Sequence, residues 1–529
     1  MLDAKARLAI HSAFQRWAKN PRDHAITLLL HDAAGTRTSH ESGFRGRFTP
    51  LSTYTRNIFG VKPDERWRYL SARTRRLARR KARQTGRLSR KSAQMGLLLG
   101  GAALVSLVSL AFAQMADWAL EKNAEWIAHN GLWAFLLLPI GLPIIRWLTL
   151  RLAPNASGSG IPQVIAALSL PPGPAQSRLV GLAQCLWKVP LTFLGMLAGA
   201  SIGREGPSVQ VGAALMLAWG QFWKARGWSL RGFHANELIA AGAAGGLAAA
   251  FNAPLAGVIF AIEELGRGTV LRWQRLVLIG VLAAGFIVVA LAGNNPYFAR
   301  ATGVVIAESV VWWVLLCGVV CGVLGGVFAR LLGKGLAGVA PARCRAWVRR
   351  HPIYCAALLG LAIACLGALT QGSVYGTGYG IASGLLAGEH PAPEGFGLAK
   401  LAATVASYWA GIPGGIFTPA LTTGAGIGEQ IWQLAGGAVD QRFIVLIAMA
   451  AFLAAATQAP LTASVVVMEM TGNQPALFWL LFACLTASMV ARQFCPQPFY
   501  HLAAGRFRRQ SVVDAERETR EPRDRQTRA

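Results

Sequence analysis

Residues 248–255 read AAAFNAPL and residues 454–461 read AAATQAPL, so one pattern recurs after 206 residues. Ten residues after the alanine that precedes each proline stands a glutamate, Glu263 in the first copy and Glu469 in the second. The chain is rich in alanine, and one such match can arise by chance. An internal duplication therefore needs a second matching pair in the same order.

That second pair lies upstream of the two copies. Residues 203–207 read GREGP and residues 415–419 read GIFTP, and their prolines are 212 residues apart. Two matches in the same order indicate duplicated halves. Membrane segments that glycine and proline interrupt at matching places are typical of transporters, whose site lies at the interface between the halves. These residues alone leave open whether the halves are inverted.

The composition is that of an integral membrane protein. Of the 529 residues, 53% are hydrophobic and 14% are charged, whereas ordinary globular domains carry roughly 25% charged residues. Residues 92–496 hold only 22 Lys/Arg and 13 Asp/Glu, and they contain apolar runs of membrane-spanning length. An ordinary soluble enzyme is therefore excluded. Among these runs we expect one apolar segment at 236–264 and two separate ones at 441–457 and 459–471.

The net charge of +28 is concentrated near the N-terminus. Thirteen Lys/Arg lie between Lys62 and Lys91, directly before the apolar run that starts at Met95. This positive-inside pattern predicts a cytoplasmic N-terminus. Anionic lipid headgroups attract such residues by roughly 1 kcal/mol each, so we expect membrane lipids rather than nucleic acid as the partner of this segment.

The charge and hydropathy patterns divide the chain into four parts. We expect a basic N-terminal extension with a weak apolar pattern, for which disorder is one reading, then a basic cytoplasmic surface helix, a transmembrane domain and a polar C-terminal tail. Their bounds are 1–65, 66–91, 92–505 and 506–529, with repeat halves at about 92–293 and 309–496.

Cysteine and histidine spacings argue against a metal centre or an enzyme. The eight cysteines form no CxxC pair, and the chain has no HExxH motif. The nine histidines avoid the interiors of the apolar segments. We therefore expect no metal, no cofactor and no enzymatic activity. A lipid-bound scaffold is a third class, but it would not require carboxylates inside the membrane domain.

Two glycine-rich motifs read as helix starts. Gly158-Ser159-Gly160-Ile161-Pro162 joins two apolar segments, and helix N-termini offer unpaired N–H groups to an anion. The alternative is an ordinary Ser/Gly helix start. A similar start at 414–419 (GGIFTP) would offer the backbone donors of Ile416 and Phe417.

Placing an ionisable side chain inside a membrane domain costs free energy, and such residues usually have a function. Arg204 and Glu205 could form a structural pair, or Glu205 could compete with an anion for helix N–H groups and leave when protonated. Glu263 and Glu264 could be a solvated pair at the membrane boundary, or one of them could relay protons. Tyr500 alone is typical of an interfacial anchor.

Four motifs together resemble a known family. GSGIP, GREGP, FNAPLAG followed by Glu263-Glu264, and GGIFTP occur in this order. The set resembles the CLC family of chloride channels and chloride/proton antiporters over about residues 66–505. The resemblance implies an all-α integral membrane protein with the CLC-type fold, in which two inverted repeats contain many tilted and partly crossing helices. It also implies a homodimer with one anion pathway in each subunit.

The resemblance assigns the anion ligands. Ser159 and Tyr500 resemble the hydroxyls that coordinate the central anion, and the backbone N–H groups of Ile416 and Phe417 resemble its other ligands. Serine at 159 favours chloride, because relatives that prefer nitrate tend to have proline at that position.

The resemblance also assigns the proton-transfer residues. Glu205 resembles the external gating glutamate, and Glu264 resembles the internal proton-transfer glutamate that antiporters have and channels commonly lack. Arg204 and Gly206 would flank the outer site. Chloride/proton antiport is therefore the leading function, with chloride ions and protons as partners. The alternative is a passive chloride channel, gated by voltage or pH, without proton coupling.

The chain departs from the family pattern in two places. Gln163 and Ile165 stand where many members carry acidic residues, which deprives the buried Lys188 of an expected partner. The CBS domain pair of many relatives is missing, so the chain resembles bacterial members. We expect a multi-pass protein of the bacterial inner membrane with both termini in the cytoplasm.

Overall fold

The structure is a computed structural model that describes residues 63–227, 234–267, 275–298, 310–389 and 392–528. Side chains are described within these ranges except at 63–91, 275–276 and 517–528. The expected N-terminal extension, residues 1–65, thus lies almost wholly outside the described residues. The chain divides into two compact units, Met1–Arg87 and Leu88–Ala529. Helix α4 (Pro63–His129) begins in the first unit and continues into the second.

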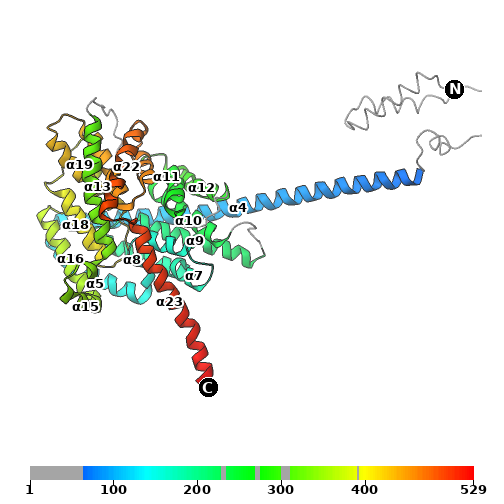
Figure 1. The fold of residues 1–529 in the computed structure, drawn as a ribbon, viewed down its shortest axis with the longest axis horizontal. Helices are drawn as coiled ribbons and strands as arrows, with labels where there is room; N and C mark the ends of the chain where they lie inside the picture. Colours follow the sequence, from blue (N-terminus) through cyan, green and yellow to red (C-terminus); the bar gives the residue numbers. More distant parts are fainter. Residues whose placement is uncertain (1–62, 228–233, 268–274, 299–309, 390–391, 529) are drawn as a thin grey trace, which may run out of the picture. The chain divides into compact units, whose positions relative to one another are not determined.

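The second unit is built of helices, and in its described residues the only β structure consists of isolated bridges (Figure 1). Helices of the first half are α5 (Leu132–Leu152), α6 (Ile161–Leu168), α7 (Pro174–Val180), α8 (Leu182–Leu197), α9 (Glu205–Ala225), α10 (Ala235–Phe251), α11 (Pro254–Phe260) and α12 (Arg275–Ala292). Those of the second half are α13 (Val310–Lys334), α14 (Leu336–Val339), α15 (Ala342–Arg350), α16 (Pro352–Leu369), α17 (Tyr379–Ala387), α18 (Phe396–Trp409), α19 (Phe417–Leu434), α20 (Gln441–Thr457), α21 (Pro460–Thr471) and α22 (Leu477–Phe494). Short turns η1 (Pro154–Ala156), η2 (Ala261–Leu265) and η3 (Gln474–Ala476) and the last helix, α23 (Phe499–Arg528), complete the set.

Six helical segments of the described chain are long and apolar enough to cross a membrane. They are Ser92–His129, Leu132–Leu152, Pro174–Leu197, Val310–Lys334, Pro352–Leu369 and Gln474–Phe494. Four shorter apolar helices lie among them, including α10 and α20. The mixture of long and short apolar helices is that of a multi-pass membrane protein in which several helices do not span the bilayer alone.

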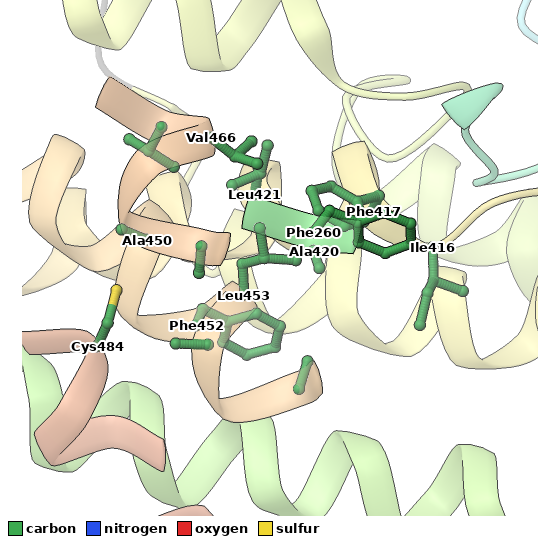
Figure 2. Close-up of a cluster of buried hydrophobic side chains, with 14 of the residues drawn as sticks. Phe260, Ile416, Phe417, Ala420, Leu421, Ala450, Phe452, Leu453, Val466 and Cys484 are labelled. Carbon is green, nitrogen blue, oxygen red and sulfur yellow. The ribbon is translucent and has the colours of Figure 1, made fainter. Parts of the chain in front are cut away.

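Helices α10 and α20, which carry the two copies of the duplicated pattern, are buried over almost their whole length. Every residue is buried from Glu237 to Phe251 in α10 and from Phe443 to Thr457 in α20. Figure 2 shows part of the apolar cluster to which Phe452 and Leu453 of α20 and Phe417 of α19 belong. A helix that is apolar on all sides is suited to the centre of a membrane bundle.

Glycine permits the same close helix contact in both halves. A Cβ atom at Gly212 of α9 would collide with the backbone of Gly242 in α10. A Cβ atom at Gly424 of α19 would lie 2.6 Å from the carbonyl oxygen of Ala448 in α20. Gly212 and Gly424 are 212 residues apart, so the duplication preserves a packing contact as well as a sequence pattern.

The apolar segment expected at 236–264 contains two helices. Helix α10 ends at Phe251, the next residue, Asn252, has a left-handed backbone with φ 53°, and α11 begins at Pro254. The second copy breaks in the same way at Gln458, with φ 59°, before α21 begins at Pro460. Proline at the first helical position and a left-handed residue at the preceding helix end explain both breaks.

The two halves meet at equivalent glycines. The N–H of Gly203 donates to the carbonyl of Gly415 at 2.7 Å, and the N–H of Gly415 donates to the carbonyl of Gly203 at 2.6 Å. These residues are 212 apart and form an antiparallel bridge. A reciprocal exchange between equivalent residues indicates a local two-fold relation between the two halves at this point.

Candidate functional site

The site is built from loops that precede short helices at the interface between the halves. Gly158 and Gly160 have φ of 71° and 106°, which only glycine adopts readily. This backbone turns the chain into α6 at Ile161. The N–H of Gly158 donates to the Ile412 carbonyl at 3.0 Å, and the N–H of Gly414 donates to the Gly158 carbonyl at 3.1 Å. The GSGIP loop is therefore fixed to the loop that leads into α19.

Ser159 and Tyr500 bring two hydroxyl groups into this interface. Each residue is 1% exposed, and neither hydroxyl has a hydrogen-bond partner among the described residues. The Tyr500 side chain interacts with that of Ser159, although it comes from the start of α23. Buried hydroxyls are nearly always paired in proteins, so two unpaired ones side by side mark a place for a polar ligand.

Two glycines, Gly206 and Gly415, let the backbone at the starts of α9 and α19 pack closely beside Ser159. A Cβ atom at Gly206 would collide with Ser159, and one at Gly415 would lie 3.0 Å from the nitrogen of Gly206. Ile416 caps α19 and Phe417 is its first residue, both 2% exposed. N–H groups in the first turn of a helix have no partner within the helix. The N–H groups of Ile416 and Phe417 can therefore donate hydrogen bonds to an anion.

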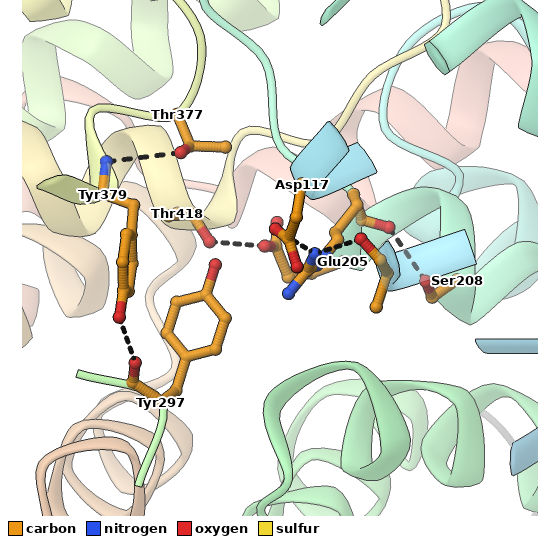
Figure 3. A network of polar contacts seen from close by, with 9 residues as sticks. Asp117, Glu205, Ser208, Tyr297, Thr377, Tyr379 and Thr418 are labelled. Carbon is orange, nitrogen blue, oxygen red and sulfur yellow. Dashed lines mark hydrogen bonds and ion pairs between the residues drawn. The ribbon is translucent and has the colours of Figure 1, made fainter. Parts of the chain in front are cut away.

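Glu205 is the first residue of α9 and is fully buried. Its Oε1 accepts a hydrogen bond from the Thr418 hydroxyl at 2.5 Å, while Oε2 has no partner in the described part of the chain. The backbone N–H groups of Glu205 and Thr418 also point at the carboxylate. The carboxylate thus occupies the N-terminal ends of α9 and α19, where an anion would otherwise be stabilised (Figure 3).

Arg204 is paired with Asp117 rather than with Glu205. Its Nη1 lies 2.5 Å from Asp117 Oδ1 and 2.7 Å from the Ala113 carbonyl, and the guanidinium lies 5.6 Å from the centre of the Tyr297 ring (Figure 3). Asp117 and Tyr297 line a cavity of about 1200 Å³. The Arg204 side chain therefore connects the loop that precedes α9 to the wall of this cavity.

Glu263 and Glu264 have different environments. Glu263 accepts hydrogen bonds from the N–H groups of Leu461 and Thr462, at 3.2 and 2.6 Å, and so caps α21. Glu264 is 1% exposed, and neither of its oxygens has a hydrogen-bond partner within the described ranges. Tyr500 interacts electrostatically with both Glu264 and Glu205. The tyrosine therefore lies within electrostatic range of both acidic groups.

Glu469 repeats the capping role of Glu263 in the other half. Its Oε1 and Oε2 accept hydrogen bonds from the N–H groups of Leu255 and Ala256, at 3.1 and 2.6 Å. Each glutamate thus caps the short helix that belongs to the other copy. The two short helices that follow the duplicated pattern, α11 and α21, are therefore joined by these reciprocal caps.

Lys188 has backbone partners instead of an acidic one. Its Nζ donates to the carbonyls of Ala156 and Gly158, both at 2.9 Å. Lys400, which lies 212 residues later, donates to Val374 and Gly376 at 2.8 and 2.7 Å. Each buried lysine holds the loop that enters a short helix, α6 in one half and α17 in the other.

The residues that replace acidic ones near Lys188 also support the loop. Gln163 Nε2 donates to the carbonyls of Asn155 and Ser157, at 3.0 and 2.7 Å. Ile165 is 4% exposed and belongs to the apolar core. A neutral amide and an apolar side chain therefore fill this position without adding negative charge beside Ser159.

Comparison with known proteins agrees with this geometry. The family model described as "Voltage gated chloride channel" matches residues 141–492. The chain is similar to the protein named "H(+)/Cl(-) exchange transporter ClcA" of Cronobacter sakazakii, with 31% identity over 75% of this chain and 86% of that protein. The protein of the same name from Yersinia pestis is 29% identical, over 75% of this chain and 84% of that protein.

The chain belongs to the CLC family of voltage-gated chloride channels. A solved structure described as a slow cyanobacterial Cl⁻/H⁺ antiporter is similar to it with a TM-score of 0.64 and 26% identity, covering 78% of this chain and 98% of the other. The all-α CLC-type fold expected from the sequence is confirmed. The CLC chain is a multi-pass membrane protein, like its bacterial relatives.

Several residues of this CLC site were not found from the sequence. Thr418 lies within the GIFTP motif, but its side chain was not assigned. Asp117 lies in an apolar helix far from the other motifs, and the role of Lys400 follows only from the 212-residue offset that also separates the two prolines. That offset was the signal available for Lys400. His501, which faces Glu264, was set aside because it lies outside the apolar segments.

Proposed function

We propose that this protein exchanges chloride for protons across the membrane. The observation that carries the proposal is that Glu205, Tyr500 and Glu264 are all buried, and that the tyrosine side chain interacts with both glutamates and with Ser159. Two acidic groups at the ends of an anion site give protons a place to bind on either side of the anion. The names of the bacterial relatives support the same exchange.

The anion is held by neutral donors. The hydroxyls of Ser159 and Tyr500 and the N–H groups of Ile416 and Phe417 surround the centre of the site, and none of these groups carries a charge. Neutral donors in a buried site bind an anion strongly enough to select it and weakly enough to release it. Lys188 donates to the Gly158 carbonyl, next to Ser159 in the chain, and so holds the loop that presents the serine hydroxyl.

Glu205 acts as the gate. Its carboxylate occupies the helix ends that attract an anion, so an ionised Glu205 and a chloride ion compete for one place. Protonation removes the negative charge and so weakens the electrostatic attraction between the side chain and the N-terminal ends of the helices. Chloride then takes the place that the carboxylate leaves, which couples one proton to anion movement. Arg204 and Gly206 flank this outer position.

Glu264 supplies protons from the other end. It is buried without a hydrogen-bond partner in the described structure, and an ionised carboxylate in such a place loses its hydration. A structural role would leave it paired, as Glu263 is. A passive channel does not need this group, and the relatives are named as exchangers, so the channel alternative is not favoured.

The protein acts as a homodimer in the bacterial inner membrane, with chloride and protons as substrates and both termini in the cytoplasm. The thirteen Lys/Arg before the first span support this orientation. Residues 66–91 form a basic helix at the membrane surface, residues 92–505 form the transport domain, and residues 506–529 form a polar tail. The halves at about 92–293 and 309–496 enclose the site. The protein acts by transport and carries out no enzymatic reaction.

The experiment uses purified protein in chloride-loaded liposomes, with chloride efflux and external pH recorded together. Chloride efflux that drives proton uptake into the vesicles against the proton gradient supports antiport. Chloride efflux without proton movement would contradict the proposal and make the protein a channel.

A further inference from the structure

The surroundings of Glu264 contain a second titratable group. Glu264 lies in the π-helical turn η2 (Ala261–Leu265), which extends α11 and is a type of turn often found at functional sites. His501 of α23 lies opposite, with Nε2 at 3.6 Å from Glu264 Oε1. This distance is too long for a hydrogen bond, and Nε2 has no other partner among the described residues.

His501 also faces a second cavity. Its side chain is 23% exposed, and it lines a cavity of about 150 Å³ together with Ile165, Ser169, Arg267, Ala504, Gly505 and Arg508. Such a volume holds several water molecules. Glu264 itself does not line this cavity. His501 is therefore the titratable group that stands between the buried carboxyl and the water.

The other charged groups near His501 and Glu264 have partners of their own or are exposed to solvent. The Arg267 guanidinium donates to the Gln458 carbonyl at 3.0 Å, Arg508 is exposed, and Glu263 caps α21. His501 lies outside the six spans, and burial, aided by the charge of Arg267, lowers the pKa of its imidazole below the usual value of about 6.5. The ring is then mainly neutral at pH 7 and able to accept a proton.

We infer that His501 carries protons between this cavity and Glu264. The imidazole takes a proton from a protonated water in the cavity, which leaves neutral water behind. When Nε2 and Glu264 Oε1 come within hydrogen-bond distance, it passes a proton from Nε2 to Oε1 and returns to its neutral form. The reverse sequence releases protons to the cavity. This inference rests on the proposed antiport and adds to it a second proton-transfer residue at the end of the path where α23 leaves the bundle.

The test compares three variants in proteoliposomes. His501→Gln keeps a hydrogen-bonding side chain of similar size but cannot titrate, and His501→Ala leaves space for added imidazole. His351→Gln is the control, because that ring packs against Trp347 and Tyr354 and does not line the cavity. Proton flux and chloride flux are measured across pH, with and without imidazole, and thermal stability is measured in parallel.

Proton flux should fall at least about tenfold in both His501 variants, with a smaller change in chloride flux, since positioned acid–base groups contribute at least that much. Added imidazole should restore proton flux in His501→Ala and leave the wild type and His351→Gln unchanged. Wild-type coupling in both His501 variants would overturn the inference. So would equal loss of both fluxes, which indicates anion access, or a loss that imidazole does not relieve. A wild-type protein without proton coupling would instead overturn the proposed function.

Discussion

Glu263 and Glu264 are neighbours in the chain, yet only Glu263 has its carboxylate engaged by the backbone. The two Glu263 oxygens accept hydrogen bonds from N–H groups at the start of α21. Neither Glu264 oxygen has a hydrogen-bond partner in the residues that the structure describes. The π-helical turn that contains both residues directs them to different surroundings. One is a structural cap, and the other is available for proton transfer.

Replacing the cap should lower stability. In Glu263→Gln the charge-assisted hydrogen bonds to α21 are weakened, and the cost should be about 1–2 kcal/mol in the free energy of unfolding. Because Glu469 makes the equivalent contacts to α11, Glu469→Gln should have a similar effect. Thermal unfolding in detergent measures both. A large loss in one variant and none in the other would contradict the two-fold relation.

Replacing Glu264 should change transport without this loss of stability. Glu264→Gln removes an ionisable group that has no hydrogen bonds to lose, so the unfolding temperature should stay within the experimental spread of the wild type. Proton flux should fall by about 100-fold, because a positioned acid–base group is removed, while chloride flux continues. Unchanged proton coupling would make Glu264 a bystander.

The gating carboxylate has a separate prediction. Glu205→Gln cannot ionise, so chloride movement should continue while proton coupling is lost. Glu429→Gln is a matched control, because Glu429 is a buried carboxylate on α19 that is held by the amides of Gln433 and Gln441. That variant should retain coupling. Proton pumping by Glu205→Gln would remove Glu205 from the gate.

Anion selectivity should depend on Ser159. Ser159→Pro removes a hydroxyl that is free to bind the anion, and preference should shift from chloride toward nitrate. Competing fluxes of the two anions in liposomes measure the shift, with Ser159→Ala as a companion that removes the hydroxyl without fixing the backbone. Selectivity that stays as in the wild type in Ser159→Pro would exclude Ser159 from the site.

The two buried lysines should have equal structural roles but unequal roles in binding. Lys188→Met and Lys400→Met each remove a donor from two buried carbonyls. The cost is about 1–3 kcal/mol for each group left unpaired, although the Gly158 carbonyl keeps the N–H of Gly414. Both variants should therefore unfold at lower temperature. Lys188→Met alone should weaken chloride binding measured by calorimetry, because Lys188 holds the loop of Ser159. Equal weakening in both variants would contradict this assignment.

The architecture could be predicted well because the sequence features that indicate it can be read directly along the chain. Charge-poor apolar runs, proline at helix starts and the 206-residue repeat are visible without contacts. The apolar run at 236–264 did not show where the break after Phe251 lies, whereas the second copy was expected as two segments. Asn252 and Gln458 both take a left-handed backbone, but neither residue type requires it, so the break could be inferred only by transferring it from one half to the other.

Side-chain partners were harder to predict, because they depend on which elements meet. Thr418 and Glu205 are 213 residues apart, and Asp117 reaches Arg204 from another helix. The resemblance singled out Glu264, but the capping of α21 by Glu263 could not be predicted before it was known which elements meet. His501 was overlooked because α23 begins beyond the last apolar span, although its first turn returns to the site.

The central claim is that anion and proton movements are coupled, and coupling must work in both directions. The most direct measurement places the purified protein in liposomes with equal chloride inside and outside, imposes a pH gradient, and follows chloride. The account predicts net chloride movement into the more acidic compartment, against the chloride gradient that it creates, in the wild type but not in Glu205→Gln or Glu264→Gln. A pH gradient that moves no chloride, in protein that conducts chloride down its own gradient, would contradict the account.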